Sequence, residues 1–189
     1  MAEETEADDE ELVRQTVSGE TNLFRVLIER HQRSILFLFA RQIGEGEVAE
    51  ELTQKCFFQA FKDLHNFPYD TTFKTWITRT ALNVMNSYYA SPAYKRKLKE
   101  IHLTTERHDR VSKIYDTSIE QKQSTLQLAI GQLGERHRRV ISICLLENYS
   151  PEEASDILAV PAKTLASRTQ KALALLHEEY LKLIEYGAQ

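Results

Sequence analysis

Small polar and basic side chains recur at helical spacing near the C-terminus, and they are the residues best suited to chemistry in this sequence. At about 100° per residue, one face of a helix there carries Lys163, Ser167, Gln170 and Lys171. Ammonium groups attract phosphate oxygens, and hydroxyl and amide groups can hydrogen-bond to base edges in a major groove. Arg168 borders this face, where it suits a backbone phosphate better than a base. The pattern favours contact with duplex DNA; the alternative is a helical hairpin whose polar face meets only solvent.

Catalytic and metal-binding patterns are missing from the sequence. It has no Gly-rich phosphate loop followed by Lys, no Cys-x-x-Cys pair and no His-Glu-x-x-His motif. Its six histidines are scattered, so ordinary surface or core-edge roles are expected for them. Cys56 and Cys144 lie far apart inside apolar helical patterns, which favours buried thiols in a reducing compartment. We therefore predict no catalytic residue, no metal ion and no cofactor.

A pair of helices must position the polar face. The sequence Ser150-Pro151-Glu152-Glu153 has the pattern of a capping box with Pro at the first helical position. Pro161 ends the short helix that follows, because the residue before a proline avoids the α region. A second helix then begins near Pro161, and its predicted buried stripe is Ala162, Leu165, Thr169, Ala172 and Leu176. Two helices joined by such a short turn form a helix-turn-helix, whose second helix enters the major groove.

The N-terminal half also has a helical pattern. Apolar residues recur there at three- and four-residue steps, and a polar break at 44–47 separates two helices. The residues 66–71 have the composition of a turn, and Thr71 is the predicted N-cap of the next helix. Phe73 and Trp76 are predicted to lie in the core. Tyr88 and Tyr89 could either lie at the core edge or stack on bases.

The charge distribution permits a nucleic-acid partner although the net charge is −4. Residues 1–11 hold seven acidic side chains and no Lys or Arg, and this end is predicted to be solvated and frayed. Without those seven, the rest of the chain has 21 acidic and 24 basic residues, which is a net positive charge. The longest apolar run, 35–40, is far shorter than the roughly 20 residues of a membrane span, and no secretory signal precedes it. These features predict a cytoplasmic protein without membrane insertion.

Several motifs in order along the chain are similar to those of one protein family. The first helical half contains Ala49-Glu50-Glu51-Leu52-Thr53-Gln54, Phe57-x-x-Ala60-Phe61-x-x-Leu64 and Phe73-x-x-Trp76-Ile77-x-x-x-Ala81-x-Asn83. The second contains Leu133-x-Glu135-Arg136-x-Arg138, the capping box, and Val160-Pro161-x-x-Thr164-x-x-Ser167-Arg168. With these motifs, the chain resembles bacterial sigma factors of the extracytoplasmic-function (ECF) group, the promoter-specificity subunits of RNA polymerase.

The resemblance implies an all-α fold of two small helical domains joined by a flexible linker, with a helix-turn-helix in the C-terminal domain. Residues 1–92 would form a sigma region 2-like domain that binds core polymerase and recognises and melts the minus-10 element. Residues 93–122, which lose apolar periodicity, would form the linker. Residues 123–189 would form a sigma region 4-like domain that recognises the minus-35 element.

The resemblance also implies three sets of functional residues. The core polymerase-binding residues would be Glu51, Gln54 and Gln59. The minus-10 residues would be Pro68, Tyr69, Asp70, Thr71, Thr72, Asn83, Asn86, Ser87, Tyr88, Lys95, Arg96 and Lys97. The minus-35 residues would be Lys163, Thr164, Ser167, Arg168, Gln170 and Lys171. The turn at 68–72 would capture a flipped-out base, which a single strand offers on its full edge at an unstacking cost of a few kcal/mol.

The implied partners are core RNA polymerase, promoter DNA and an anti-sigma factor, which can itself be membrane-bound. The chain departs from the family pattern at five positions: Lys55 replaces an acid, Gly134 a proline, Ser87 an Asp or Asn, Ala166 a Lys or Arg, and Lys163 a glycine. One alternative is a sigma-mimicking decoy that sequesters an anti-sigma protein without binding DNA. Another is a plain helix-turn-helix repressor, which would leave the first domain unexplained. Lys163, Arg168 and Lys171 favour the DNA-binding sigma factor over the decoy.

Overall fold

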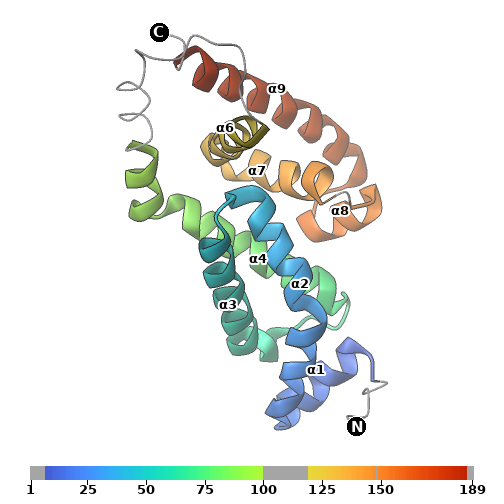
Figure 1. Ribbon diagram of the computed structural model, residues 1–189. Helices are drawn as coiled ribbons and strands as arrows, with labels where there is room; N and C mark the ends of the chain where they lie inside the picture. Colours follow the sequence, from blue (N-terminus) through green and yellow to red (C-terminus); the bar gives the residue numbers. More distant parts are fainter. Residues whose placement is uncertain (1–6, 100–118, 148, 187–189) are drawn as a thin grey trace.

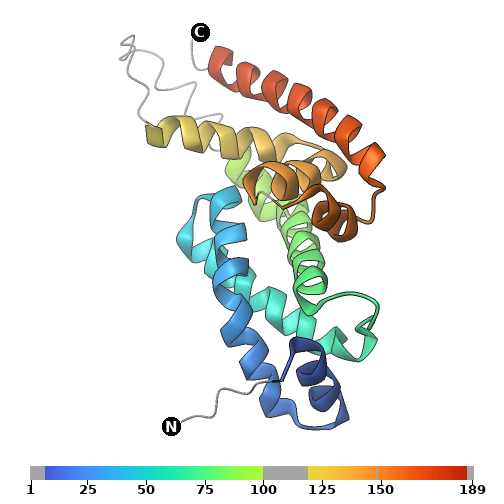
Figure 2. The ribbon, with the colours of Figure 1, turned by 90° about the vertical axis from the view of Figure 1, so that its right-hand side faces the viewer.

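The computed structural model describes residues 7–99, 119–147 and 149–186. Within these ranges every regular element is helical and no strand occurs, so the predicted all-α fold is confirmed. The helices form two groups, one above the other in Figure 1: the N-terminal group is coloured blue to green and the C-terminal group yellow to red. The turned view in Figure 2 shows the same two groups in direct contact.

The N-terminal group is built around three long helices. Its elements are α1 (Asp9–Ser18), η1 (Thr21–Leu23), α2 (Phe24–Ile43), α3 (Gly46–Asp63), η2 (Leu64–Asn66) and α4 (Phe73–Ala90). Their apolar stripes meet in one core, in which Leu27, Phe39 and Phe73 are fully buried. Trp76 is half-buried and packs against this core, with its ring centroid 5.6 Å from that of Phe67. Phe73 therefore lies in the core as predicted, whereas Trp76 lies at its edge.

Local sequence signals set the ends of these helices. Gly44 ends α2 with a φ of 76°, a left-handed conformation that glycine adopts without strain, as expected from the polar break. Thr72 is the N-cap of α4, because its hydroxyl accepts a hydrogen bond from the backbone N–H of Thr75 at 3.2 Å. The prediction that Thr71 caps this helix is wrong by one residue. The Thr71 N–H instead donates to the Pro68 carbonyl and belongs to the preceding turn.

The acidic N-terminal residues take part in the fold. The Asp9 carboxylate lies 2.8 Å from a guanidinium nitrogen of Arg30. The carboxylate of Glu10 accepts a hydrogen bond of 2.9 Å from the backbone N–H of Phe73, at the start of α4. The expectation of a solvated, frayed acidic end is therefore wrong for Asp9 and Glu10, while residues 1–6 lie outside the described part of the chain.

The C-terminal group surrounds a second core. Its elements are α6 (Ile119–Gln132), α7 (Glu135–Ile141), the π-helical turn η3 (Ser142–Leu146), α8 (Pro151–Leu158) and α9 (Ala162–Tyr186). Ile130, Ile141 and Ile143 are almost completely buried in this core. Leu82, from α4 of the N-terminal group, is buried in the same cluster. The second core is therefore completed by a residue of the first group.

Short-range signals also shape α8 and the turn after it. The Ser150 hydroxyl accepts from the Glu153 N–H, and the Glu153 carboxylate accepts from the Ser150 N–H, so the predicted capping box is confirmed. The helix ends at Ala159, a non-glycine residue with a φ of 52°. The turn 159–161 then leads into α9. On α9, Leu165 and Ala172 are buried as predicted. Ala162, the first residue of the helix, is exposed.

Two other predictions need correction. Residues 92–99 are helical and Tyr94 is buried against the first core, so this part of the predicted linker 93–122 is ordered structure. The last part of that range, 119–122, lies in α6, and residues 100–118 lie outside the described residues.

Cys56 is buried as predicted, and burial raises the pKa of its thiol to about 12. Cys144 is only half-buried, because it lies at the margin of the second core in η3.

Candidate nucleic-acid interface

The outward face of α9 carries the predicted minus-35 residues. Lys163, Ser167, Gln170 and Lys171 are exposed, while Thr164 and Arg168 are half-buried at the border of the face. The Ser167 hydroxyl donates to the Thr164 carbonyl one turn earlier, at 3.0 Å, and its oxygen can still accept a further hydrogen bond. One straight helix thus presents two ammonium groups, an amide and a hydroxyl on the same side. Such a surface can donate to both phosphates and base edges.

Cations from α7 extend this basic surface. Burial lowers the pKa of His137, and the positive charges of Lys171, Arg136 and Arg168 lower it further. These three cations therefore act on one imidazole from two packed helices. The face of α9 near Lys171 is consequently electropositive, as phosphate attraction requires.

The loop before α4 holds the first part of the predicted minus-10 set. Tyr69, Asp70 and Thr72 are exposed, and Pro68 and Thr71 are half-buried. The Tyr69 ring packs edge-on against Phe67, with centroids 5.1 Å apart, and the guanidinium carbon of Arg14 lies 5.2 Å from the Tyr69 centroid. Even so, 51% of Tyr69 remains exposed. The loop therefore presents an anchored aromatic ring on which an unpaired base could stack.

Two asparagines of α4 make contacts that the sequence did not indicate. The Asn86 side-chain amide donates to the Glu135 carboxylate of α7 at 3.0 Å. The Asn83 side-chain carbonyl accepts from the Arg139 guanidinium, also of α7, at 3.4 Å. Part of the predicted minus-10 surface is therefore occupied by the C-terminal group.

The neighbouring residues of α4 lie at different depths. Ser87 is exposed, and its hydroxyl donates to the Asn83 carbonyl within the helix. Tyr88 is half-buried, with its ring centroid 5.2 Å from that of Tyr94. Burial raises the pKa of the Tyr88 hydroxyl, and the negative charge of Glu51 raises it further. Tyr88 therefore lies at the core edge, and Tyr89 is buried in the core.

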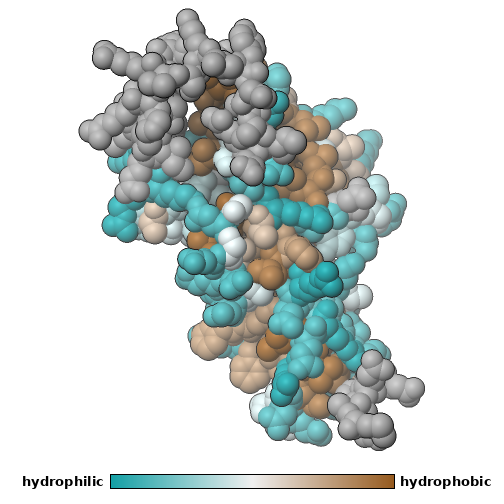
Figure 3. All heavy atoms as spheres, in the orientation of Figure 1, coloured by the Kyte–Doolittle hydropathy of each residue, from teal (hydrophilic) through white to brown (hydrophobic). Residues whose placement is uncertain are grey.

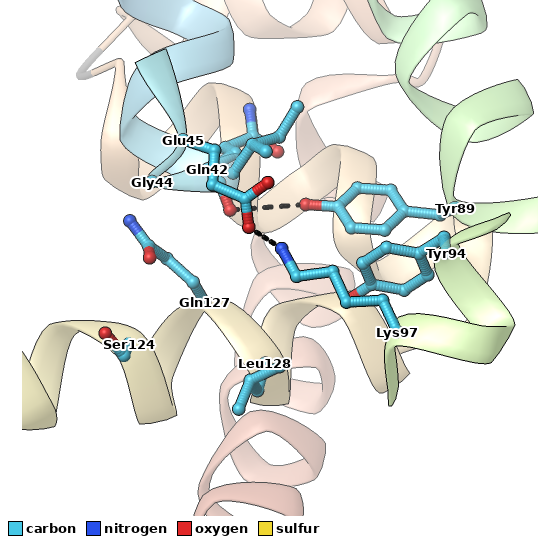
Figure 4. Close-up of a pocket in the computed structure, with 10 residues that line it drawn as sticks. Gln42, Gly44, Glu45, Tyr89, Tyr94, Lys97, Ser124, Gln127 and Leu128 are labelled. Carbon is cyan, nitrogen blue, oxygen red and sulfur yellow. Dashed lines mark hydrogen bonds and ion pairs between the residues drawn. The ribbon is translucent and has the colours of Figure 1, made fainter. Parts of the chain in front are cut away.

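The three basic residues of the 92–99 helix that belong to the predicted minus-10 set are not equivalent. Lys95 and Arg96 are exposed to solvent. Lys97 is half-buried and forms an ion pair with Glu45, drawn as a dashed line in Figure 4. Burial lowers the pKa of Lys97. Two of these three cations are therefore open to a phosphate, and the third is held by the protein.

The predicted polymerase-binding residues share the outer surface of α3. Glu51, Gln54 and Gln59 are exposed, and the Gln59 amide donates to Asp63 at 2.7 Å. The same surface carries Phe58, a ring that is 64% exposed. Brown side chains interrupt the hydrophilic surface along the outer edge of α3 in Figure 3. The sequence analysis missed Phe58, although its position off the buried stripe of this helix was a usable signal.

A cavity of about 190 Å³ lies where the two helical groups meet. The carbonyl of Gln42 accepts a hydrogen bond of 3.3 Å from the Tyr89 hydroxyl on its wall. Tyr94, Lys97 and Gln127 complete much of the lining, and Figure 4 shows them converging from α6 and the 92–99 helix. Its wall combines residues of both groups, so the cavity is a feature of their contact.

Comparison with known proteins agrees with this architecture. Residues 27–93 match the family described as sigma-70 region 2. The chain is 26% identical over 178 residues to the RNA polymerase sigma-H factor of Pseudomonas aeruginosa, covering 89% of this chain and 91% of that protein. It is 24% identical over 184 residues to the ECF RNA polymerase sigma-E factor of Escherichia coli, covering 93% and 96%. Over nearly its whole length the chain is therefore similar to RNA polymerase sigma factors, among them one of the ECF group.

Solved structures share the fold of this chain. It is similar to CnrH, solved in complex with the cytosolic domain of CnrY, with a TM-score of 0.58 and 26% identity, covering 90% of this chain and 95% of CnrH. It is also similar in fold to the sigma factor RpoE of Bartonella quintana, solved with the anti-sigma factor NepR. That TM-score is 0.50 at 17% identity, covering 84% and 96%. The similarity therefore extends across both helical groups.

Two further properties concern the described residues only. Among them, no group of three or more His, Cys, Asp or Glu side chains is arranged to hold a metal ion. None of the described helices is long and apolar enough to cross a membrane.

Proposed function

We propose that this chain is an ECF sigma factor, which binds core RNA polymerase and directs promoter-specific transcription initiation without a catalytic site of its own. In this proposal, α9 recognises duplex DNA near minus 35, and the 68–72 loop with α4 recognises and opens the minus-10 element. Transcription initiation requires both core polymerase and the chromosome, so the proposed location of the protein is the cytoplasm. In this proposal the first domain extends through the 92–99 helix, and the second domain begins with α6.

The observation that carries the proposal is the open polar face of α9 in a chain that also contains a sigma-70 region 2 match. Lys163 and Lys171 lie two turns apart on this face, so they can reach phosphates on either side of the groove that the helix enters. Gln170, exposed between them along the helix, can pair bidentately with an adenine. A decoy that only mimics a sigma factor would have no need of these groups.

The outer surface of α3 is the proposed docking site for core polymerase. It combines the carboxylate of Glu51 and the amides of Gln54 and Gln59 with the exposed ring of Phe58. Interfaces are typically built from such aromatic residues with polar groups around them. The Lys62 ammonium lies 5.6 Å from the Phe58 centroid, which restricts the orientation of the ring before any partner binds.

An anti-sigma factor is the proposed inhibitory partner. Among the similar chains, CnrH was solved with the cytosolic domain of CnrY, and RpoE was solved with the anti-sigma factor NepR. Exposed apolar residues on both helical groups, among them Phe58 and Leu173, give such a partner surfaces to cover. The anti-sigma partner would therefore compete with polymerase.

Transcription with purified core polymerase tests the proposal. We expect specific starts from a library of promoter fragments only when the sigma factor is added. Lys171→Ala should weaken upstream duplex binding, and Asp70→Ala should impair opening while duplex binding is retained. Lys122→Ala removes an exposed lysine of α6 and should leave both steps unchanged. If the protein neither binds core polymerase nor supports any start, yet captures an anti-sigma protein, the decoy function replaces this one.

A further inference from the structure

The first helix of the chain is fixed firmly to the N-terminal core. Leu12 and Val13 of α1 are completely buried. At the start of the helix, the Asp9 carboxylate lies 2.8 Å from the guanidinium of Arg30 and 2.6 Å from Nε2 of His31, both on α2. These contacts hold both the core-facing side of α1 and its first turn. The helix is therefore a rigid support for whatever its other side chains contact.

A second face of α1 contacts the loop before α4. Glu10 and Arg14 are four positions apart, which places them on one side of the helix. Glu10 contacts Phe73, where the loop ends, and Arg14 contacts Tyr69, near its beginning. Figure 2 shows α1, in dark blue, beside the connection that leads into α4. One side of α1 thus holds both ends of the loop to which the proposed function assigns a flipped-out base.

Glu10 satisfies a backbone donor at the start of α4. The first N–H groups of a helix have no acceptor within the helix, and they carry partial positive charge. Thr72 serves the N–H of Thr75, and the Glu10 carboxylate accepts from the N–H of Phe73 at 2.9 Å. This carboxylate is half-buried and comes from 63 positions earlier in the chain. Glu10 therefore fixes the residue at which the loop becomes a helix.

Arg14 holds the exposed ring of the loop. Its guanidinium carbon lies 5.2 Å from the centroid of the Tyr69 ring, which also packs edge-on against the buried Phe67. Glu11, one turn before Arg14, forms an ion pair of 3.1 Å with the guanidinium. A cation over an aromatic face is attracted by the ring quadrupole. Since 51% of Tyr69 remains exposed, its ring is restricted in orientation and still open to a base.

We propose that Glu10 and Arg14 are positioning residues for the capture of an unpaired promoter base, and that Arg14 influences base preference through the orientation of Tyr69. In this proposal neither residue touches the DNA. A ring that is already oriented loses less conformational entropy when a base stacks on it, so more of the stacking energy is available for opening. The proposal rests on the proposed function, since it assumes that the 68–72 loop binds a flipped-out base.

The charges of these residues support an indirect role. The Glu10 carboxylate would repel DNA phosphates, so a direct contact of this residue with the DNA backbone is unfavourable. The carboxylate of Glu11 partly neutralises Arg14, which weakens the attraction of its guanidinium for phosphate. Glu10 and Arg14 are therefore better suited to holding the loop than to binding the DNA backbone.

Amide hydrogen exchange in the free, full-length chain tests the role of Glu10. Glu10→Ala removes the acceptor, so the N–H of Phe73 should exchange about tenfold faster. Glu10→Gln is the matched control, because its side-chain carbonyl can still accept this hydrogen bond, and exchange should stay close to wild type. Unchanged exchange at Phe39, which is completely buried on α2, verifies that the variants stay folded. Equal exchange at Phe73 in Glu10→Ala and wild type would overturn the role of Glu10.

Promoter opening by the polymerase holoenzyme tests the role of Arg14. On a promoter fragment that supports specific starts, Arg14→Met should slow opening about threefold, the effect of losing one exposed cation–π contact, while duplex binding stays unchanged. Arg14→Lys keeps a cation near the ring and should restore most of the rate. Arg25→Met is the matched control, because it removes another exposed arginine that is paired with a carboxylate on its own helix, that of Glu29.

Two further measurements separate positioning from a general structural role. Single-stranded minus-10 oligonucleotides with each of the four bases at each position in turn should differ less in affinity for the Arg14→Met holoenzyme than for wild type. In a Tyr69→Leu background, Arg14→Met should have no further effect on opening, because Arg14 acts through the ring. A full threefold loss in that background, or an unchanged base preference, would overturn the role of Arg14. If the wild-type holoenzyme opens no promoter, the proposed function fails, whereas exchange at Phe73 still tests the contact of Glu10.

Discussion

Arg138 of α7 places its guanidinium carbon 4.2 Å from the ring centroid of Tyr89 of α4. The residues come from different helical groups, and both are buried. Burial lowers the pKa of Arg138, and the guanidinium nevertheless remains a cation, because arginine is not deprotonated in proteins. Among the described residues its Nε atom has no hydrogen-bond partner, while one terminal nitrogen donates to the Gly131 carbonyl at 3.1 Å. The aromatic face therefore replaces part of the solvation that the cation loses.

Arg138 and Tyr89 should be energetically coupled. We expect Arg138→Met and Tyr89→Leu each to lower the free energy of unfolding by about 2 kcal/mol, and the double variant to lose about 1 kcal/mol less than their sum. Urea denaturation of the four proteins gives the coupling. Tyr89→Phe keeps the ring and loses only the hydroxyl bond to Gln42, so it should retain the coupling. Strictly additive losses would contradict a direct contact.

The capping box should contribute locally to stability. Ser150→Ala removes the acceptor for the Glu153 N–H, and we expect a loss of about 1 kcal/mol. For a chain of this length that corresponds to a melting temperature lower by about 2–4 °C. Ser167→Ala is a suitable control, because the Ser167 hydroxyl bonds only within its own helix among the described contacts. Equal shifts for the two variants would show that the cap makes no special contribution.

Asp9 should make stability depend on pH in the acid range. Burial acts to raise the pKa of its carboxyl, but the hydrogen bonds and charges of Arg30 and His31 outweigh burial, and the pKa lies below 3.8. A group with a lowered folded-state pKa stabilises the fold fully above its unfolded value and loses this contribution as pH falls through the folded value. We therefore expect Asp9→Asn to destabilise the protein by about 1 kcal/mol at pH 6.

Thermal unfolding at several pH values checks the Asp9 prediction. The difference between Asp9→Asn and wild type should shrink as the pH falls below about 3.8. Glu20→Gln, at an exposed position after α1, should track the wild type throughout. A difference for Asp9→Asn that stays constant into strong acid would rule out ionisation as its source.

Lys171 should contribute one phosphate contact. We expect Lys171→Ala to weaken binding of polymerase holoenzyme to minus-35 duplexes of any sequence, and to reduce the slope of log affinity against log salt by about 1. Fluorescence anisotropy across a salt series measures both quantities. Gln170→Ala should instead change preference between duplex sequences while the salt slope stays the same. Identical salt slopes for Lys171→Ala and wild type would place this lysine away from the DNA backbone.

The correct sequence predictions rest on contacts between residues close in the chain. The capping box joins Ser150 to Glu153, three positions later. The end of α2 depends on the left-handed backbone conformation of a single residue, Gly44. The N-cap of α4 shows the limit of this information, because Thr71 and Thr72 are chemically equivalent caps. Glu10 accepts a hydrogen bond from the Phe73 N–H, next to Thr72, and this contact spans 63 residues. No local pattern could therefore choose between the two threonines.

Periodicity and caps act within a few residues, so the helices, the turn before α9 and the polar face of that helix could be predicted from the sequence. Three-dimensional packing was needed to place Tyr94 against Gly131, Arg79 at the end of α8 and Glu135 on Asn86. These contacts join residues that are distant in the chain. Each of the polar side chains involved could equally well have been hydrated at the surface. Their arrangement depends on how two hydrophobic cores pack against each other, and a pattern read along one helix carries no information about that packing.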